Sequence, residues 1–161
     1  MGLDMYLTQK VYTGIPWDDG DRQGNLEIVP STGEDILKIP MNQIKAIDLE
    51  FLYWRKANAI HKWFVENVQD GVDNCREYYV EQSKIEELYK DIAKAILSQD
   101  AGILPTMDGF FFGSTEADDY YWRELNRTAT QLKILVDEWK KPYEEQDPVI
   151  RASDFYQFAI K

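Results

Sequence analysis

Alternating residues near the two ends of the chain constrain its fold more than any other feature. Residues 1–12, MGLDMYLTQKVY, place Leu3, Met5 and Leu7 on one side of an extended backbone and polar or aromatic residues on the other. Residues 153–161, SDFYQFAIK, alternate in the same way. A period of two is typical of a strand with one buried face. The sequence therefore predicts a strand near each end, and we expect the two strands to share one sheet.

Turn residues mark the segments that follow the first strand. Glycines, a proline and aspartates over 13–24 indicate a loop. The segments 25–30 and 35–40 flank STG at 31–33, which predicts a hairpin. Each flanking segment ends in proline, and proline is confined to sheet edges because it cannot donate to a strand ladder. We therefore expect the hairpin to lie at an edge.

Apolar periodicity predicts three helices in the rest of the chain. The first spans 48–68, and the second begins at a capping box formed by Ser83 and Glu86. The third begins near Thr115. Short extended segments are expected between the helices, at 75–81 and as a buried strand at 110–112.

This order of elements indicates an α+β fold. We expect a mixed or antiparallel sheet that contains the N- and C-terminal strands, with about three helices packed on it. The 161 residues fit one domain, 1–161, which is long enough to bury a substantial core.

The predicted helix 48–68 carries two polar residues on its apolar side. At about 100° per residue, Asn58 and His61 fall in the same arc as Phe51 and Trp54. Burying an unpaired amide or imidazole costs roughly 1–3 kcal/mol, so both need partners. Backbone groups or tyrosine hydroxyls hold them in one interpretation. In another, the helix lines a pocket where His61 is a general acid/base or ligand donor and Asn58 orients it. A third places them at an interface.

A second segment favours a cleft beside this helix. A glycine turn follows FFF at 110–112, but the acidic residues of the next helix start would repel a phosphate. The aromatic residues after this turn are instead typical of a cleft wall. Arg55 is either a clamp for an anion or part of a surface salt bridge. The candidate cleft comprises seven residues: Trp54, Arg55, Asn58, His61, Gly113, Tyr120 and Tyr121.

One Cys and one His limit the chemistry of the chain. A single Cys excludes an intramolecular disulfide, and these two residues provide no zinc cluster. We expect Cys75 to be a small buried residue rather than a nucleophile. Asp70 and Asp73 lie in a turn without the calcium-loop pattern, so this turn is expected to be solvated. No cofactor and no metal site are predicted, and the cytoplasm is the expected compartment.

The net charge of −11 bears on possible partners. Nucleic-acid binding depends on Lys and Arg, so no direct nucleic-acid partner is expected. Apolar runs are too short for a membrane span, so no membrane partner is expected. An acidic surface suits docking onto a protein with a basic surface. The candidate acidic interaction surface comprises six residues: Asp18, Asp19, Asp21, Glu116, Asp118 and Asp119.

Three segments carry a resemblance to a known family. They are MGLDMYL at 1–7, YWRKANAIHKWFVENVQDGVDNC at 53–75 and LPTMDGFFFGSTEADDYY at 104–121. Together they resemble a family of uncharacterised proteins of bacteriophages, prophages and bacteria. The resemblance implies no catalytic residue. It implies a small accessory protein that binds or inhibits a protein of the host.

Two functions are therefore expected as alternatives. The first is an acidic accessory protein that binds and modulates a host protein, most concretely as an inhibitor of a bacterial defence nuclease or CRISPR effector. The second is an enzyme or small-ligand-binding protein whose cleft is lined by the helix with Arg55, Asn58 and His61. The oligomeric state is left open.

Overall fold

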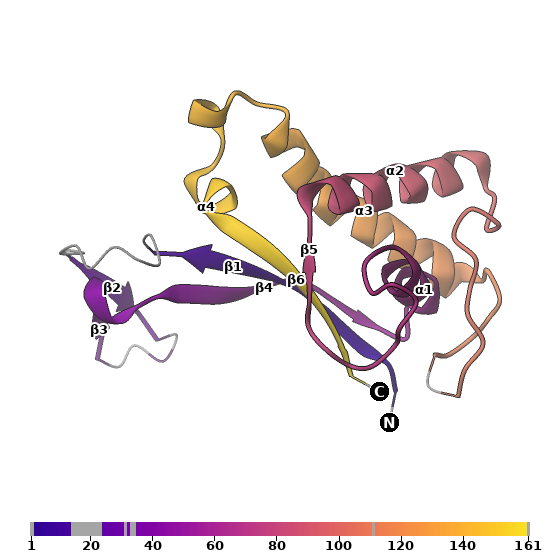
Figure 1. The fold of residues 1–161 in the computed structure, drawn as a ribbon, viewed down its shortest axis with the longest axis horizontal. Helices are drawn as coiled ribbons and strands as arrows, with labels where there is room; N and C mark the ends of the chain where they lie inside the picture. The colour runs from indigo at the N-terminus through magenta and orange to yellow at the C-terminus, as the bar shows by residue number, and fades with distance from the viewer. Residues whose placement is uncertain (1, 14–23, 31, 33–34, 111, 161) are drawn as a thin grey trace.

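A four-stranded antiparallel sheet forms the centre of the computed structural model, which describes residues 2–13, 24–30, 32, 35–110 and 112–160. The strand order is β4 (Ala46–Arg55), β1 (Asp4–Tyr12), β6 (Ser153–Ile160) and β5 (Tyr78–Val80). Every neighbouring pair is antiparallel. The predicted α+β fold is confirmed, and the strands near the two ends of the chain are neighbours in the middle of the sheet (Figure 1).

The sheet has a buried inner face and an exposed or half-buried outer face. Leu3, Met5 and Leu7 are fully buried, and Phe155 and Ala159 of β6 are buried on the same side. Because side chains alternate across a strand, the residues between them point the other way. The predicted alternation in both strands is confirmed.

Three helices cover the inner face: α1 (Asn58–Asn67), α2 (Gln82–Ser98) and α3 (Asp119–Trp139). Figure 1 shows all three on one side of the sheet, with α2 and α3 side by side. The buried stripe of α2 is Ile85, Leu88, Ile92 and Ala95. The buried stripe of α3 is Tyr121, Leu125, Thr128, Leu132, Leu135 and Val136. These stripes meet the inner face of the sheet in one core.

Smaller elements lie outside this core. Strands β2 (Asn25–Ile28) and β3 (Leu37–Pro40) form a separate two-stranded antiparallel sheet, so the predicted hairpin is confirmed. It projects at one end of the molecule (Figure 1). The short elements are η1 (Met41–Gln43), η2 (Tyr143–Glu145) and α4 (Pro148–Arg151). The predicted loop at 13–24 lies almost wholly outside the described residues.

The predicted helix 48–68 is wrong in its first half, where the chain forms β4 and a turn before α1 begins. The pairing of β1 with β4 shifts between Leu7 and Thr8, where Leu52 and Glu50 are the partners and Phe51 is an extra residue. Such a bulge breaks the period of two. Both Phe51 and Leu52 then pack on the core, and the apolar spacing imitates a helix. Long-range pairing with β1 outweighs this local pattern.

The starts of the other two helices differ from their predictions. Helix α2 begins after Glu81, which makes no side-chain cap bond, and the Ser83 hydroxyl donates to the Glu81 carboxylate at 3.2 Å. The predicted capping box with Glu86 is therefore wrong. Helix α3 begins after Asp118, not at Thr115, because the Asp118 carboxylate accepts a hydrogen bond from the Tyr121 amide at 2.9 Å.

Two further predictions are corrected. Phe110 is 97% exposed and Phe112 is buried, and neither lies in a strand, whereas Phe111 is outside the described residues. Cys75 is exposed with a positive φ of 57°, in the turn before β5, so it is not a buried core residue. In both segments the turn geometry sets the burial, and an apolar composition does not reveal that geometry.

Candidate functional site

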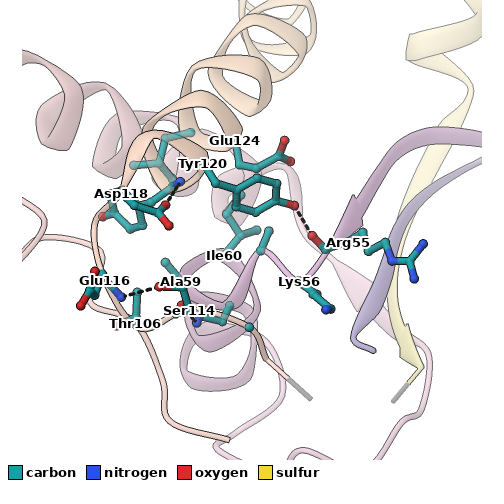
Figure 2. A pocket seen from close by; sticks show the side chains of 15 residues that line it. Arg55, Lys56, Ala59, Ile60, Thr106, Ser114, Glu116, Asp118, Tyr120 and Glu124 are labelled. Atoms are coloured by element: carbon teal, nitrogen blue, oxygen red, sulfur yellow. Dashed lines mark hydrogen bonds between the residues drawn. The ribbon is translucent and has the colours of Figure 1, made fainter. Parts of the chain in front are cut away.

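A cavity of about 440 Å³ lies where the first turns of α1 and α3 face each other across the loop 104–118. Its walls combine apolar, aromatic, hydroxyl and charged side chains. The lining residues are Arg55, Lys56, Ala57, Asn58, Ala59, Ile60, Thr106, Gly113, Ser114, Glu116, Asp118, Tyr120, Tyr121, Glu124 and Leu125. Figure 2 shows how the labelled side chains surround this space.

The α1 wall begins at a sharp turn in the backbone. Lys56 has a positive φ of 56°, and its amide donates to the Leu3 carbonyl at 2.7 Å. This turn ends β4 and starts α1 at Ala57, which has no side chain that can cap a helix. The first amides of a helix lack intrahelical partners and form its positive end. Ala59 and Ile60 line the cavity, so this first turn of α1 forms part of its wall.

A side chain of α1 also holds the opposite loop. The Asn58 amide is buried and donates to the Ser114 carbonyl at 2.6 Å. This partner fits the interpretation in which backbone groups hold the buried side chain of Asn58. The bond ties the loop 104–118 to the first turn of α1, so Asn58 shapes the cavity as well as lining it.

Gly113 lets the loop approach the turn at Lys56. Its φ is +85°, a conformation that L side chains rarely adopt. A Cβ atom at this position would lie 3.2 Å from the Lys56 Cβ. Glycine is therefore required both by the backbone conformation and by the close contact.

Two tyrosines of α3 complete the cavity. The Tyr120 hydroxyl donates to the Arg55 carbonyl, and the Tyr121 hydroxyl donates to the Leu104 carbonyl at 2.9 Å. Burial raises the pKa of Tyr121 to about 12, and the nearby Asp100 charge adds to this effect. Burial and the charge of Glu124 also raise the pKa of Tyr120. Both phenols stay protonated, and thus able to donate, at neutral pH.

The charges around the cavity are unequal. Three carboxylates line it, those of Glu116, Asp118 and Glu124, and Glu124 is paired with Arg127 at 2.8 Å. Arg55 contributes its main chain, because its guanidinium points away from Tyr120 in Figure 2. The interpretation of Arg55 as a clamp inside the cleft therefore gains no support. The carboxylates outweigh the cationic groups in the cavity wall.

The structure gathers five of the seven predicted cleft residues: Arg55, Asn58, Gly113, Tyr120 and Tyr121. Trp54 and His61 do not line the cavity. Trp54 is buried in β4, and its indole donates to the Thr128 hydroxyl at 2.8 Å. His61 is 0% exposed, with Nε2 at 2.9 Å from a carboxylate oxygen of Asp73 and its ring 5.2 Å from Phe112.

The predicted acidic surface divides into three parts. Glu116 and Asp118 line the cavity, and Asp119 is exposed at the start of α3. Asp18, Asp19 and Asp21 lie outside the described residues. The acidic residues that sequence reasoning grouped as an interaction surface are thus partly a cavity wall.

The turn after α1 has a structural role. Asp73 contacts His61, and the Asn74 amide donates to the Tyr78 hydroxyl at 2.9 Å. Across the described ranges, no group of three or more His, Cys, Asp or Glu side chains is placed to hold a metal ion. No helix among the described elements is both long enough and apolar enough to span a membrane.

Sequence reasoning missed eight residues that line the cavity: Lys56, Ala57, Ala59, Ile60, Thr106, Ser114, Glu124 and Leu125. Ser114 has the role of a turn residue, as its hydroxyl accepts from the Glu116 amide at 3.1 Å. Thr106 reaches the Thr115 carbonyl at 2.7 Å. The loop 104–118 has no regular period, so its glycine and hydroxyl residues were the only available signal.

Comparison of the chain with models of protein families, with curated proteins and with solved structures finds no match.

Proposed function

We propose that this protein binds a small organic ligand carrying a cationic amine group in the cavity between α1 and α3. The observation that carries the proposal is a cavity of about 440 Å³ with an aromatic wall and three carboxylates. Ligand sites commonly have volumes of roughly 300–1,000 Å³ and combine apolar walls with a few polar groups. The cavity has this size and this mixture.

The electrostatics favour an amine at one end of the ligand. Glu116 and Asp118 offer carboxylate oxygens, and the ring of Tyr120 adds an aromatic surface, over which the Arg123 guanidinium already lies 5.1 Å from the ring centroid. A carboxylate and an aromatic face both attract ammonium groups. The overall charge of −11 also steers cations toward the protein.

The first turn of α1 suits an acceptor group of the ligand. The uncapped first turn of α1 presents its positive end beside Ala59 and Ile60. A carbonyl or carboxylate group of a ligand can accept hydrogen bonds there. The favoured ligand therefore carries an amine and an acceptor group on a small apolar frame, as amino-acid-like compounds do.

The position of the cavity in the sequence adds support. Apart from Glu124 and Leu125, every lining residue lies in the segments 53–75 and 104–121, on which the family resemblance rests. The proposal is one of binding, and it assigns no catalytic role to any lining residue.

A matched pair of variants tests this proposal. Asp118→Asn removes a carboxylate of the cavity but keeps the helix cap, because Asn caps a helix as well as Asp does. Asp119→Asn makes the same charge change one residue away, outside the cavity wall. A thermal-shift screen of amines, amino acids and neutral isosteres, followed by calorimetry of the best compound, provides the measurement.

We expect Asp118→Asn to weaken amine binding by about tenfold or more, since a hydrogen bond to a charged group contributes roughly 1.5–3 kcal/mol. Asp119→Asn should change the affinity by less than about twofold. A screen in which no amine stabilises the wild type, or equal losses in both variants, would overturn the proposal.

A second function is proposed on different evidence. The net charge of −11 and the resemblance to phage-type proteins support an acidic accessory protein that binds a basic host protein, such as a defence nuclease or CRISPR effector. Its test is inhibition of such a nuclease by the purified protein. Inhibition should weaken as the salt concentration rises, because salt screens exposed charges. Loss of inhibition in Asp118→Asn alone would point back to the cavity.

A further inference from the structure

The outer face of the four-stranded sheet carries a band of aromatic side chains. The register places Tyr6 opposite both Tyr53 and Phe158, and Tyr156 opposite Tyr79. Two pairs of rings in the band are in contact. The ring centroids are 5.2 Å apart for Tyr6 and Tyr53 and 5.7 Å apart for Tyr79 and Tyr156. The six residues Tyr6, Tyr12, Tyr53, Tyr79, Tyr156 and Phe158 are called the aromatic face below.

These rings are accessible in the structure. Tyr79 is 52% exposed, and the other five are half-buried, whereas their neighbours along each strand fill the core. Helices α1, α2 and α3 lie on the opposite side of the sheet (Figure 1). Large aromatic groups gathered on an exposed sheet face are typical of a binding surface.

Carboxylates surround the aromatic face. The alternation of β4, β1 and β6 directs four acidic side chains to this side: Asp4, Asp48, Glu50 and Asp154. Two cationic side chains share it, Lys10 and Arg55. Lys10 already has an ion-pair partner, because its ammonium lies 3.8 Å from the Asp48 carboxylate. The charge of this face is therefore negative.

Two tyrosines of the face, Tyr156 and Tyr79, have raised pKa values, and nearby carboxylates contribute to the shifts. A hydrogen bond with Tyr12 and burial raise the pKa of Tyr156, and the charges of Asp154 and Glu77 raise it further. Burial, followed by the charges of Asp154 and Glu81, raises the pKa of Tyr79. Both phenols therefore stay protonated at neutral pH, and the nearby carboxylates add to the effects of hydrogen bonding and burial.

A cationic group of the protein itself already lies over one ring of this face. The Lys10 ammonium sits 4.7 Å from the centroid of the Tyr156 ring. A cation over an aromatic ring beside a carboxylate is a favourable arrangement, and the guanidinium of arginine suits it best because it is flat and stacks on rings.

From this charge and ring pattern we infer that the aromatic face is a docking surface for an extended, arginine-bearing segment of a partner protein. The inference rests on the second proposed function, that of binding a basic partner, and assigns it a place on the fold. An aromatic sheet face can also stack nucleic-acid bases, but such platforms follow the phosphate backbone with positive charge. The carboxylates of this face favour the basic peptide.

The probe for this inference is a short synthetic peptide of alternating arginine and glycine, compared with an oligothymidylate of the same length. Binding is measured by calorimetry at about 0.05 M and about 0.15 M salt. The double variant Glu50→Gln with Asp154→Asn removes two carboxylates of the face. Its control, Glu144→Gln with Glu145→Gln, removes two exposed carboxylates of η2. Tyr79→Thr removes one ring but keeps a residue with good strand propensity.

We expect the wild type to bind the peptide, more weakly at the higher salt. The face variant should lose about tenfold in affinity and Tyr79→Thr about fivefold, whereas the control should lose less than about twofold. Unchanged melting curves of the variants establish that the sheet is intact.

Each of the other outcomes would contradict a different proposal. Equal losses in the face variant and its control would overturn the docking surface and leave the basic-partner function in place. Binding of the oligothymidylate in preference to the peptide, weakened by Tyr79→Thr, would make the face a nucleic-acid platform. If the wild type binds neither probe, the docking surface fails, whereas the basic-partner function is still decided by the nuclease inhibition assay and the amine-binding cavity is unaffected.

Discussion

The Tyr120 hydroxyl donates a hydrogen bond to the Arg55 carbonyl and so joins the first turn of α3 to the last residue of β4. This bond closes one side of the cavity. It also brings together parts of the chain that are 65 positions apart in the sequence. The geometry of the cavity therefore depends on how α3 is seated against the sheet.

Tyr120→Phe should loosen this seating with a small loss of stability. A partly exposed neutral hydrogen bond contributes roughly 0.5–1.5 kcal/mol. We expect the free energy of unfolding to fall by about 1 kcal/mol and ligand affinity to fall several-fold, because the aromatic wall remains but its position is less fixed. Urea denaturation and calorimetry check the two values. Unchanged stability and affinity would contradict this role of Tyr120.

Gly113→Ala should destabilise the protein and deform the cavity. The added Cβ would lie 3.2 Å from the Lys56 Cβ, in a backbone conformation with φ of +85°. Forcing an L side chain into such a conformation costs roughly 1–3 kcal/mol. Gly71, at φ +75° with nothing within 4 Å of an added Cβ, provides a control for backbone strain alone. A loss at Gly113 no greater than that of Gly71→Ala would argue against the close contact with Lys56.

His61→Gln should lower stability without a separate effect on ligand binding. His61 is fully buried beside Asp73 and outside the cavity wall. Breaking a buried polar pair costs roughly 1–3 kcal/mol. Ligand affinity of the folded fraction should match that of the wild type. The contrary result, lost binding at full stability, would restore His61 as a site residue.

Alkaline pH should destabilise the protein through the buried phenol of Tyr121. The pKa of Tyr121 is raised from its ordinary value of 10.0 to about 12 in the folded state. The unfolded chain therefore releases this proton first as pH rises, so the stabilisation is complete below pH 10 and is lost between pH 10 and about 12. This one group accounts for roughly 2–3 kcal/mol. Urea midpoints measured from neutral to alkaline pH should fall over this window, and Tyr121→Phe should fall less steeply. Parallel curves for the two proteins would contradict the assignment.

The strands near the two ends were predictable because their information is local. In β1 and β6 each buried residue alternates with a residue of the outer face, and no bulge interrupts the pairing of β1 with β6. The buried stripes of α2 and α3 could be predicted from the sequence for the same reason. In β4, by contrast, the extra residue Phe51 gave the strand a helical spacing. Only the pairing with β1 reveals that error.

The candidate site was predictable in part. Asn58 and Gly113 stood out as a polar residue on an apolar face and a glycine between aromatic segments. Their partners did not, because the Asn58–Ser114 bond joins positions 56 apart and the loop that carries Ser114 has no period. His61 met the same sequence criterion as Asn58 and yet lies outside the cavity. The position of a residue on the helical arc predicts whether its side chain is buried. It does not predict which groups that side chain contacts.

The central position of β1 and β6 sets the order in which this protein can fold. The hydrogen bond from Gln9 to Ser153 spans 144 positions, and β6 is the strand that links β1 to β5. During synthesis β1 and β4 can pair early, but β1 keeps one open edge and β5 has no neighbour until β6 leaves the ribosome. Topologies dominated by such distant pairings fold slowly. A chain that stops before residue 153 therefore leaves β1 with one unpaired edge and β5 without a partner strand.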